Sequence, residues 1–246
     1  MVKSFDSDKK IIQQREHYAN IAREFDTKYN RENSNHYYKI EEIENAFLTY
    51  LPQTNDGWDF MEVGAGSGIH AKYLVDSLGK KIKSFLLSDL SAEMLENARK
   101  RLGEHTNIEY LASPAESIPT VKKFDGIYVS GSMHHFTDYR QSIIDMKSHL
   151  KENGIMVICE PNVYNPINFV KAVTDFSLET GQFTVTRKNV CNALIGENFE
   201  ILSSRTLHYR GESKLFTTLY PYAKMEKFSV LNPLAIMFLV VAKIKR

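Results

Sequence analysis

The sequence lacks most of the features that would place a protein outside the cell or in a membrane. It has two cysteines, Cys159 and Cys191, too few for a disulfide framework, and no C-x-x-C pair of the kind that binds zinc. Its first sixteen residues are polar and contain no apolar segment typical of a secretory signal. The longest apolar run, Leu234–Ala242, is about half as long as a membrane span requires. We therefore expect a cytoplasmic protein without a transmembrane segment.

The sequence also lacks a charge excess of either sign. The 31 Lys and Arg residues balance 30 Asp and Glu residues, so the formal net charge is +1. Such a chain has no general field that would attract a phosphate backbone, which argues against a nucleic-acid partner. With 246 residues, 43% of them hydrophobic and 25% charged, the composition is that of an ordinary globular protein of one or two domains.

Between Asp59 and Cys159, short apolar runs alternate with amphipathic segments of about ten residues. The expected strands are Trp58–Val63, Ser84–Ser88, Ile108–Ala112, Gly126–Ser130 and Ile155–Glu160. The expected helices between them are His70–Leu78, Ala92–Leu102 and Tyr139–Leu150. This alternation predicts βαβ units around a parallel sheet.

Capping residues support the helix boundaries. Ser91 is a candidate N-cap, and Glu93 lies in the first turn, where a carboxylate interacts favourably with the helix dipole. Asn153-Gly154 follows the helix that we expect to end near Lys151, and suits a left-handed helix end.

The two flanks have a different character. The first fifty residues have helical periodicity, interrupted by the polar stretch 28–35 and ended by Pro52. Residues 163–198 show no clear strand and connect the fifth strand to candidate strands at Phe199–Leu207 and Leu234–Lys243. A connection of that length is usually functional.

A glycine-rich turn, Glu62-Val63-Gly64-Ala65-Gly66-Ser67-Gly68, joins the first strand to the following helix. Glycines there allow positive φ and close approach of a ligand to the free N–H groups of the helix. The pattern departs from the dinucleotide fingerprint G-x-G-x-x-G, because Ile69 takes the place of the third glycine. Glu62 would repel a pyrophosphate and attract an ammonium group, so S-adenosylmethionine fits better than a dinucleotide. A tight turn without a ligand is the alternative.

At this point the sequence resembles the class I S-adenosylmethionine-dependent methyltransferases. The resemblance covers about residues 15–160, and four further segments carry it besides the glycine turn. They are Asp89 after the second strand, Ala115–Pro119, Phe124–Phe136 with its paired histidines, and Tyr18-x-x-x-Ala22-x-x-Phe25-Asp26.

The resemblance implies an α/β, Rossmann-like fold. We expect a seven-stranded, mostly parallel sheet with helices on both faces, a helical N-terminal lid and a helical insertion after strand five. The chain would be a single domain. Its parts would be a lid (1–52), a cofactor-binding core (53–162), an acceptor-side insertion (163–198) and the last strands (199–246).

The resemblance also implies a cofactor site for S-adenosyl-L-methionine and its product S-adenosyl-L-homocysteine. Asp89 would accept both ribose hydroxyls, and backbone amides near Ala115 would meet the adenine, although Pro114 replaces an Asp that often contacts its amino group. The cofactor-binding residues expected are Tyr18, Glu62, Gly64, Ala65, Gly66, Gly68, Asp89, Leu90, Met94, Ala115, Glu116, Ser130 and His135.

Methyl transfer is an in-line displacement that requires positioning and, for some acceptors, removal of a proton, but no metal. His135 and His134 are the candidate bases, because an imidazole titrates near neutral pH. The alternative is that one of them packs under the cofactor and the other faces solvent. Glu160 could orient an acceptor hydroxyl or amine, or be a solvated residue at a strand end. Cys159 is expected to be a buried hydrophobe.

The acceptor is expected to be a small or lipid-like molecule that receives the methyl group on O, N or C. No Asn-Pro-Pro-Tyr segment follows the fourth strand, which disfavours DNA methylation. Aromatics near Tyr164-Asn165-Pro166 and Tyr220-Pro221-Tyr222 could line an apolar pocket. Basic residues beside Leu234–Ala242 could touch a membrane surface, unless that run is a buried strand. The alternatives are a non-catalytic cofactor-binding regulatory protein and, disfavoured by Ile69 and Glu62, a nicotinamide-dependent reductase.

Overall fold

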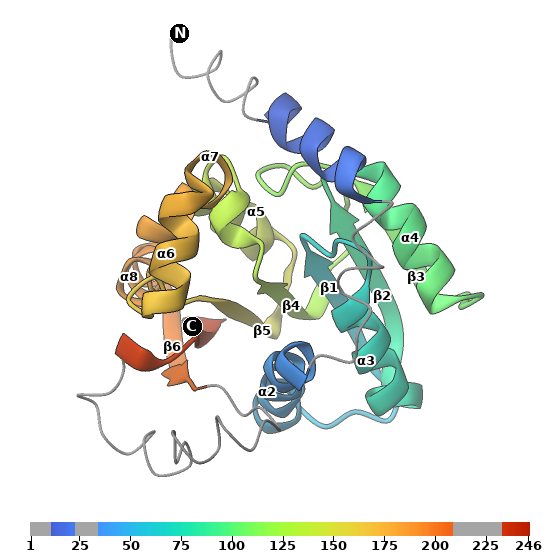
Figure 1. Cartoon of the computed structure of the whole chain (residues 1–246). Coiled ribbons are helices and arrows are strands. Elements are labelled where there is room, and N and C mark those ends of the chain that lie inside the picture. Colours follow the sequence, from blue (N-terminus) through green and yellow to red (C-terminus); the bar gives the residue numbers. More distant parts are fainter. Residues whose placement is uncertain (1–10, 23–33, 209–232) are drawn as a thin grey trace, which may run out of the picture.

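The computed structural model describes residues 11–22, 34–208 and 233–246. Its centre is one sheet of seven strands in the order β3-β2-β1-β4-β5-β7-β6 (Figure 1). The strands are β1 (Trp58–Val63), β2 (Ile82–Asp89), β3 (Ile108–Ala112), β4 (Phe124–Ser130), β5 (Leu150–Pro161), β6 (Phe199–Leu207) and β7 (Met237–Ile244). All seven coincide with or overlap the strands expected from the sequence.

Strands β1 to β5 pair in parallel, and β7 lies antiparallel between β5 and β6. The order reverses at β1, which pairs with β2 on one side and β4 on the other. In an open α/β sheet, ligands bind beyond the carboxyl ends of the strands at such a reversal. The expectation of a mostly parallel, Rossmann-like sheet is confirmed.

Helices cover both faces of the sheet, as Figure 1 shows. One face packs against α2 (Ser34–Tyr50), α3 (Ile69–Leu78) and α4 (Ala92–Leu102), the other against α5 (Tyr139–Ser148) and α8 (Arg187–Gly196). The strands are buried almost continuously because both faces are covered, as in β4, where only Asp125 is not fully buried.

The insertion after β5 is helical, as expected. It contains α6 (Pro166–Thr174), α7 (Phe176–Glu179) and the 3₁₀ turn η3 (Thr180–Phe183), followed by α8. Two other 3₁₀ turns are η1 (Gly79–Lys81) and η2 (Met133–His135). Residues 11–22 are also helical, and we call them the lid helix.

The capping expectations have mixed outcomes. Ser91 Oγ accepts a hydrogen bond from the Met94 amide at 3.2 Å, so Ser91 is the N-cap of α4 as predicted. The prediction of a left-handed helix end at Asn153-Gly154 was wrong. Helix α5 already ends at Ser148, and Gly154 lies inside β5 without positive φ. A Cβ on Gly154 would meet the Phe124 carbonyl oxygen at 2.9 Å, so glycine is required there by close strand packing.

Among residues 163–207, which the structure describes, the aromatic side chains are not buried together. Phe199 is fully buried in the core, whereas Tyr164, Phe169, Phe176 and Phe183 are exposed on the surface of the insertion. The remaining candidates, Tyr209, Phe216, Tyr220, Tyr222 and Phe228, lie outside the described residues. The described aromatics near Asn165-Pro166, Tyr164 and Phe169, are therefore exposed rather than enclosed in an apolar pocket.

The apolar run near the C-terminus is a buried strand. Residues Met237 to Ala242 of β7 are buried between β5 and β6, so they offer no surface for membrane contact. Within the described ranges, none of the helices combines the length and the apolar character needed to cross a bilayer.

Candidate active site

A cleft of about 620 Å³ lies beyond the carboxyl ends of the parallel strands. The lid helix forms one wall, the glycine turn and the loops after β2, β3 and β4 form others, and α6 and α7 close the far side. Most residues expected at the cofactor line this cleft: Tyr18, Gly64, Ala65, Gly66, Asp89, Leu90, Met94, Ala115, Glu116, Ser130 and His135. His134 also lines it. Glu62, Gly68 and Glu160 are not among the described lining residues.

The glycine turn presents backbone rather than side chains to the cleft. Gly64, Gly66 and Gly68 all have positive φ. A Cβ on Gly66 would meet no heavy atom within 4 Å, so that position faces open space. A Cβ on Gly68 would lie 2.8 Å from that of Ala98, which shows that Gly68 allows α3 to pack closely on α4. Gly66 therefore leaves space in the cleft, whereas Gly68 allows the close packing of two helices.

Asp89 fastens the turn to the end of β2. One carboxylate oxygen accepts a hydrogen bond from the Gly66 amide at 2.7 Å, and the other accepts one from the Ser91 amide at 2.9 Å. Burial raises the pKa of Asp89, although these amide hydrogen bonds oppose the shift. The carboxylate lines the cleft and retains lone pairs for a ligand.

Glu62 points away from the cleft. Its side chain is 1% exposed, and one carboxylate oxygen lies 3.5 Å from His70 Nδ1. Burial, with a smaller contribution from the negative charge of Asp89, raises the pKa of Glu62 to about 8. At neutral pH this carboxyl group is largely protonated. The structure does not bring it to the cleft, where the expected attraction for a cofactor ammonium would act.

His134 and Glu160 form a buried pair. His134 Nδ1 lies 2.6 Å from Glu160 Oε2, while Glu160 Oε1 accepts hydrogen bonds from the Ser132 and Met133 amides at 2.9 Å each. Glu160 is 0% exposed, so it is neither solvated nor able to touch an acceptor directly. It instead holds the turn η2 and fixes the orientation of the His134 ring.

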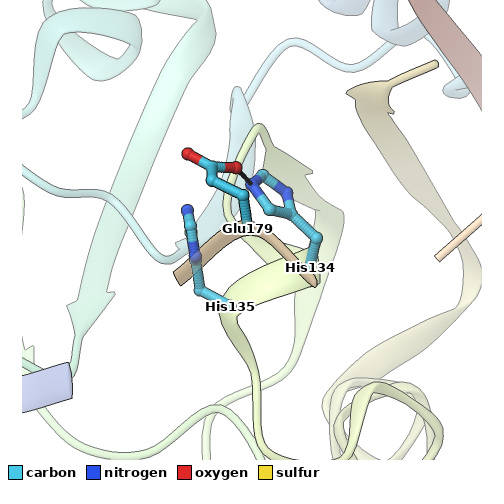
Figure 2. Close-up of side chains that lie close together, drawn as sticks. All are labelled: His134, His135 and Glu179. Atoms are coloured by element: carbon cyan, nitrogen blue, oxygen red, sulfur yellow. Dashed lines mark hydrogen bonds and ion pairs between the residues drawn. The ribbon is translucent and has the colours of Figure 1, made fainter. Parts of the chain in front are cut away.

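Glu179 of α7 contacts the other nitrogen of the same ring. His134 Nε2 lies 3.1 Å from Glu179 Oε2. Figure 2 marks this contact with a dashed line. Burial alone would lower the pKa of His134, but the carboxylates of Glu160 and Glu179 raise it to about 9. The ring is therefore an imidazolium at neutral pH and donates a hydrogen bond to each carboxylate.

Glu179 has two other partners. Lys171 Nζ lies 2.7 Å from its Oε1, and Gln182 Nε2 lies 2.6 Å from its Oε2. Burial opposes ionisation, but His134 and Lys171 together hold the pKa of Glu179 well below its usual range.

A ring nitrogen of His134, one of His135 and an oxygen of Glu179 lie within 4.8 Å of one another, a spacing that a cation could bridge. Because the Glu179 carboxylate already binds the His134 ring, the Lys171 ammonium and the Gln182 amide, we assign the cluster as an ion-pair network.

His135 lies beside this pair and contacts the lid helix. Its ring centroid is 4.0 Å from that of His134 and 5.6 Å from that of Tyr18. The Gln14 side chain donates a hydrogen bond to the His135 carbonyl oxygen. At the other end of the lid helix, Asn97 of α4 donates one to the Ala22 carbonyl oxygen at 2.7 Å. The lid helix thus spans the cleft from η2 to α4. Phe25 and Asp26 of the lid motif lie outside the described residues.

Sequence reasoning missed four charged residues of the cleft: Lys39 of α2, Lys171 of α6, Asp175, and Glu179 at the end of α7. None of them belongs to a motif, because they reach the cleft from elements outside the segments that carry the motifs. The helical periodicity of Ile40, Ile43 and Phe47, all buried, marked the core face of α2 but not the function of the adjacent lysine.

Comparison with known proteins agrees with this geometry. Residues 60–154 match the family described as "Methyltransferase domain". The ubiquinone/menaquinone biosynthesis C-methyltransferase UbiE of Wigglesworthia glossinidia brevipalpis is 28% identical over 138 residues, 54% of each chain. The match thus spans about half the length of that relative.

Solved methyltransferases share the fold over most of their length. The methyltransferase solved with the Haloferax volcanii Trm112 activator has a TM-score of 0.67 at 15% identity, covering 93% of this chain and 98% of its own. The plantazolicin methyltransferase BpumL, solved with S-adenosylhomocysteine, has a TM-score of 0.63 at 12% identity, with both chains fully covered. The chain therefore has the fold of solved methyltransferases, and its residues 60–154 match the methyltransferase-domain family.

Proposed function

We propose that this protein transfers the methyl group of S-adenosylmethionine to a carbon or oxygen that must first lose a proton, and that His134 accepts this proton. The carrying observation is the buried His134–Glu160 pair, in which a carboxylate at 2.6 Å orients a ring that lines the cleft. A carboxylate on Nδ1 leaves Nε2 as the nitrogen that exchanges protons.

An acceptor can reach His134 Nε2 by replacing the hydrogen bond between that nitrogen and Glu179. Lys171 and Gln182 retain the Glu179 carboxylate when its hydrogen bond from His134 opens. Glu179 itself is a poor base, because its pKa is lowered by the neighbouring cations. The acceptor therefore binds between η2 and α7, with its acidic proton toward His134.

Methyl transfer then follows from positioning. The acceptor C–H or O–H bond breaks and its proton moves to His134 Nε2. When bound, S-adenosylmethionine would supply an electrophilic methyl carbon to the electron pair left on the acceptor, and the electrons of the broken C–S bond would stay on sulfur to give neutral S-adenosylhomocysteine. Asp89 would hold the ribose, and Tyr18 with His135 would enclose the methionine end of the cofactor.

The acceptor side of the cleft contains charged groups, which bears on the acceptor class. Beyond the expected cofactor residues, the cleft continues to Lys39, Lys171, Asp175 and Glu179. A small acceptor with an acidic proton fits these groups, and a lipid-like acceptor would present its polar head to them. The relative named as a C-methyltransferase supports carbon as the attacked atom. This extension of the cleft also favours an enzyme over a non-catalytic sensor, which needs no acceptor space.

Radiolabelled methyl transfer to a panel of acceptors tests the proposal. The panel contains 1,3-dicarbonyls, hydroquinones and phenols. It also contains alkyl amines, which in their neutral form can be methylated without a base that removes a proton first. We expect transfer to carbon or oxygen acids, with kcat/KM rising with pH through about 9 as His134 loses its proton. In the His134→Gln variant this rise and most turnover should disappear, while S-adenosylhomocysteine affinity in calorimetry stays unchanged. Tight cofactor binding without transfer to any member would favour the sensor.

A further inference from the structure

Lys39 is a cation in the cleft that has no direct partner among the residues the structure describes. The residue precedes Ile40 in α2 and is partly buried. Its Nζ lies 3.8 Å from where a Cβ on Gly131 would stand, which places the ammonium at the start of the loop that carries His134. In the described part of the chain, no hydrogen bond or ion pair to Lys39 Nζ is formed.

The negative groups near Lys39 are already occupied. Glu160 is close enough to act on Lys39 electrostatically, but its oxygens bind the Ser132 and Met133 amides and His134. The Cys159 thiol is neutral, because burial raises its pKa to about 12. Burial lowers the pKa of Lys39, as expected for an ammonium that has lost water without gaining a counter-ion.

An unpaired ammonium in a partly desolvated position reduces the stability of the fold, and a ligand that pairs with it would remove this cost. The group that matches it is an anionic oxygen. When an acceptor loses its proton to His134, the negative charge collects on a carbonyl or phenolic oxygen of that acceptor. Lys39 of α2 and His134 of η2 line the same cleft, and Lys39 Nζ lies beside the β4–η2 loop at Gly131, so one small molecule can contact both.

We propose that Lys39 is a catalytic residue that binds the anionic oxygen of an enolate- or phenolate-forming acceptor. This inference rests on the proposed function, and it names the acceptor class as carbon or oxygen acids whose conjugate base carries its charge on oxygen. A preorganised ammonium stabilises the charge as it develops, which lowers the barrier to proton removal.

The test uses 4-nitrophenol, whose phenolate absorbs visible light, bound to the full chain saturated with S-adenosylhomocysteine. We expect the wild-type protein to prefer phenolate over phenol at least tenfold, seen as a lowered apparent pKa of the bound probe. Lys39→Met should abolish this preference, and Lys39→Arg should restore it. Lys171→Met is the matched control, because that lysine lines the cleft but is paired with Glu179, and it should keep the preference.

Thermal melting separates this role from a structural one. Lys39→Met should melt at the same temperature as the wild type or higher, because it removes an unpaired buried charge. Absence of a phenolate preference in the wild type, its persistence in Lys39→Met, or a clear loss of stability in that variant would overturn the inference. Failure of the proposed function is distinguishable, because it abolishes methyl transfer without changing probe ionisation.

Discussion

At the scale of single residues, Asp89 combines a structural and a binding role. Its carboxylate holds the Gly66 and Ser91 amides and still faces the cleft. Asp89→Ala should lower the affinity for S-adenosylhomocysteine at least tenfold in calorimetry, because charge-assisted hydrogen bonds to the ribose contribute about 1.5–3 kcal/mol each. Asp89→Asn keeps an acceptor oxygen and should lose less. Equal affinity in all three proteins would show that Asp89 does not contact the cofactor.

Glu160 is expected to act through His134 rather than on the acceptor. In Glu160→Gln, one of the two carboxylates that raise the pKa of His134 is lost, so that pKa should fall below about 9. The rising limb of kcat/KM should move to lower pH. Its plateau should fall about 10- to 100-fold, because the amide orients the ring without stabilising the imidazolium. The His134 titration by NMR and the rate profile should shift together; a slower rate with an unshifted titration contradicts this role.

At the scale of elements, the glycine turn is the part of the cleft most sensitive to substitution. Gly66 has φ +54 and open space where a side chain would project, so Gly66→Val should fill part of the cofactor site. We expect S-adenosylhomocysteine binding to become undetectable by calorimetry. Gly103→Val is the matched control, since Gly103 has φ +70, also meets nothing within 4 Å and does not line the cleft. It should also strain the backbone at a positive-φ position and retain binding.

The packing of η3 on η2 sets the position of Glu179. A Cβ on Gly181 would lie 1.7 Å from the His134 carbonyl oxygen, so Gly181→Ala must displace η3. Glu179 should then move away from His134 Nε2, and the pKa of His134 should fall, as NMR titration can measure. Gly196→Ala, at an open position in α8, is the control. An unchanged His134 titration in Gly181→Ala would show that Glu179 follows the ring independently of η3.

At the scale of the whole molecule, the His134 network makes folding stability depend on pH. The pKa of His134 is raised from 6.5 to about 9 in the folded protein. The folded state therefore holds the proton more tightly than the unfolded state. The resulting stabilisation, on the order of 3 kcal/mol, is complete below pH 6.5 and is lost as pH rises through about 9.

Urea unfolding between pH 6 and 9.5 measures this linkage. The free energy of unfolding of the wild type should fall relative to that of His134→Gln as pH rises, because the variant lacks the titrating group. Glu62, whose pKa is raised to about 8, also reduces stability as pH rises, but equally in both proteins. If the difference in the free energy of unfolding between the two proteins did not change with pH, His134 would not be protonated in the folded protein as proposed.

The sequence by itself determined the parts of the protein that depend on local chain chemistry. Apolar runs identified every strand, and the buried Ser91 cap began α4 as predicted. The motifs Gly64-x-Gly66 and Asp89 could be found because a strand, a tight turn and a helix N-terminus follow one another directly. Such features need only neighbours in sequence, and the structure places these motifs together in the cleft.

Only the tertiary structure decided which side chains meet. The orientation of Glu62 away from the cleft and the burial of Glu160 depend on how neighbouring strands and helices cover them. Glu179 and Lys39 reach the cleft from α7 and α2, more than a hundred residues apart, so no spacing could associate them. The position of β7 between β5 and β6 was likewise decided by the tertiary structure. The apolar run 237–242 predicted a buried strand, but not which strands would lie on either side of it.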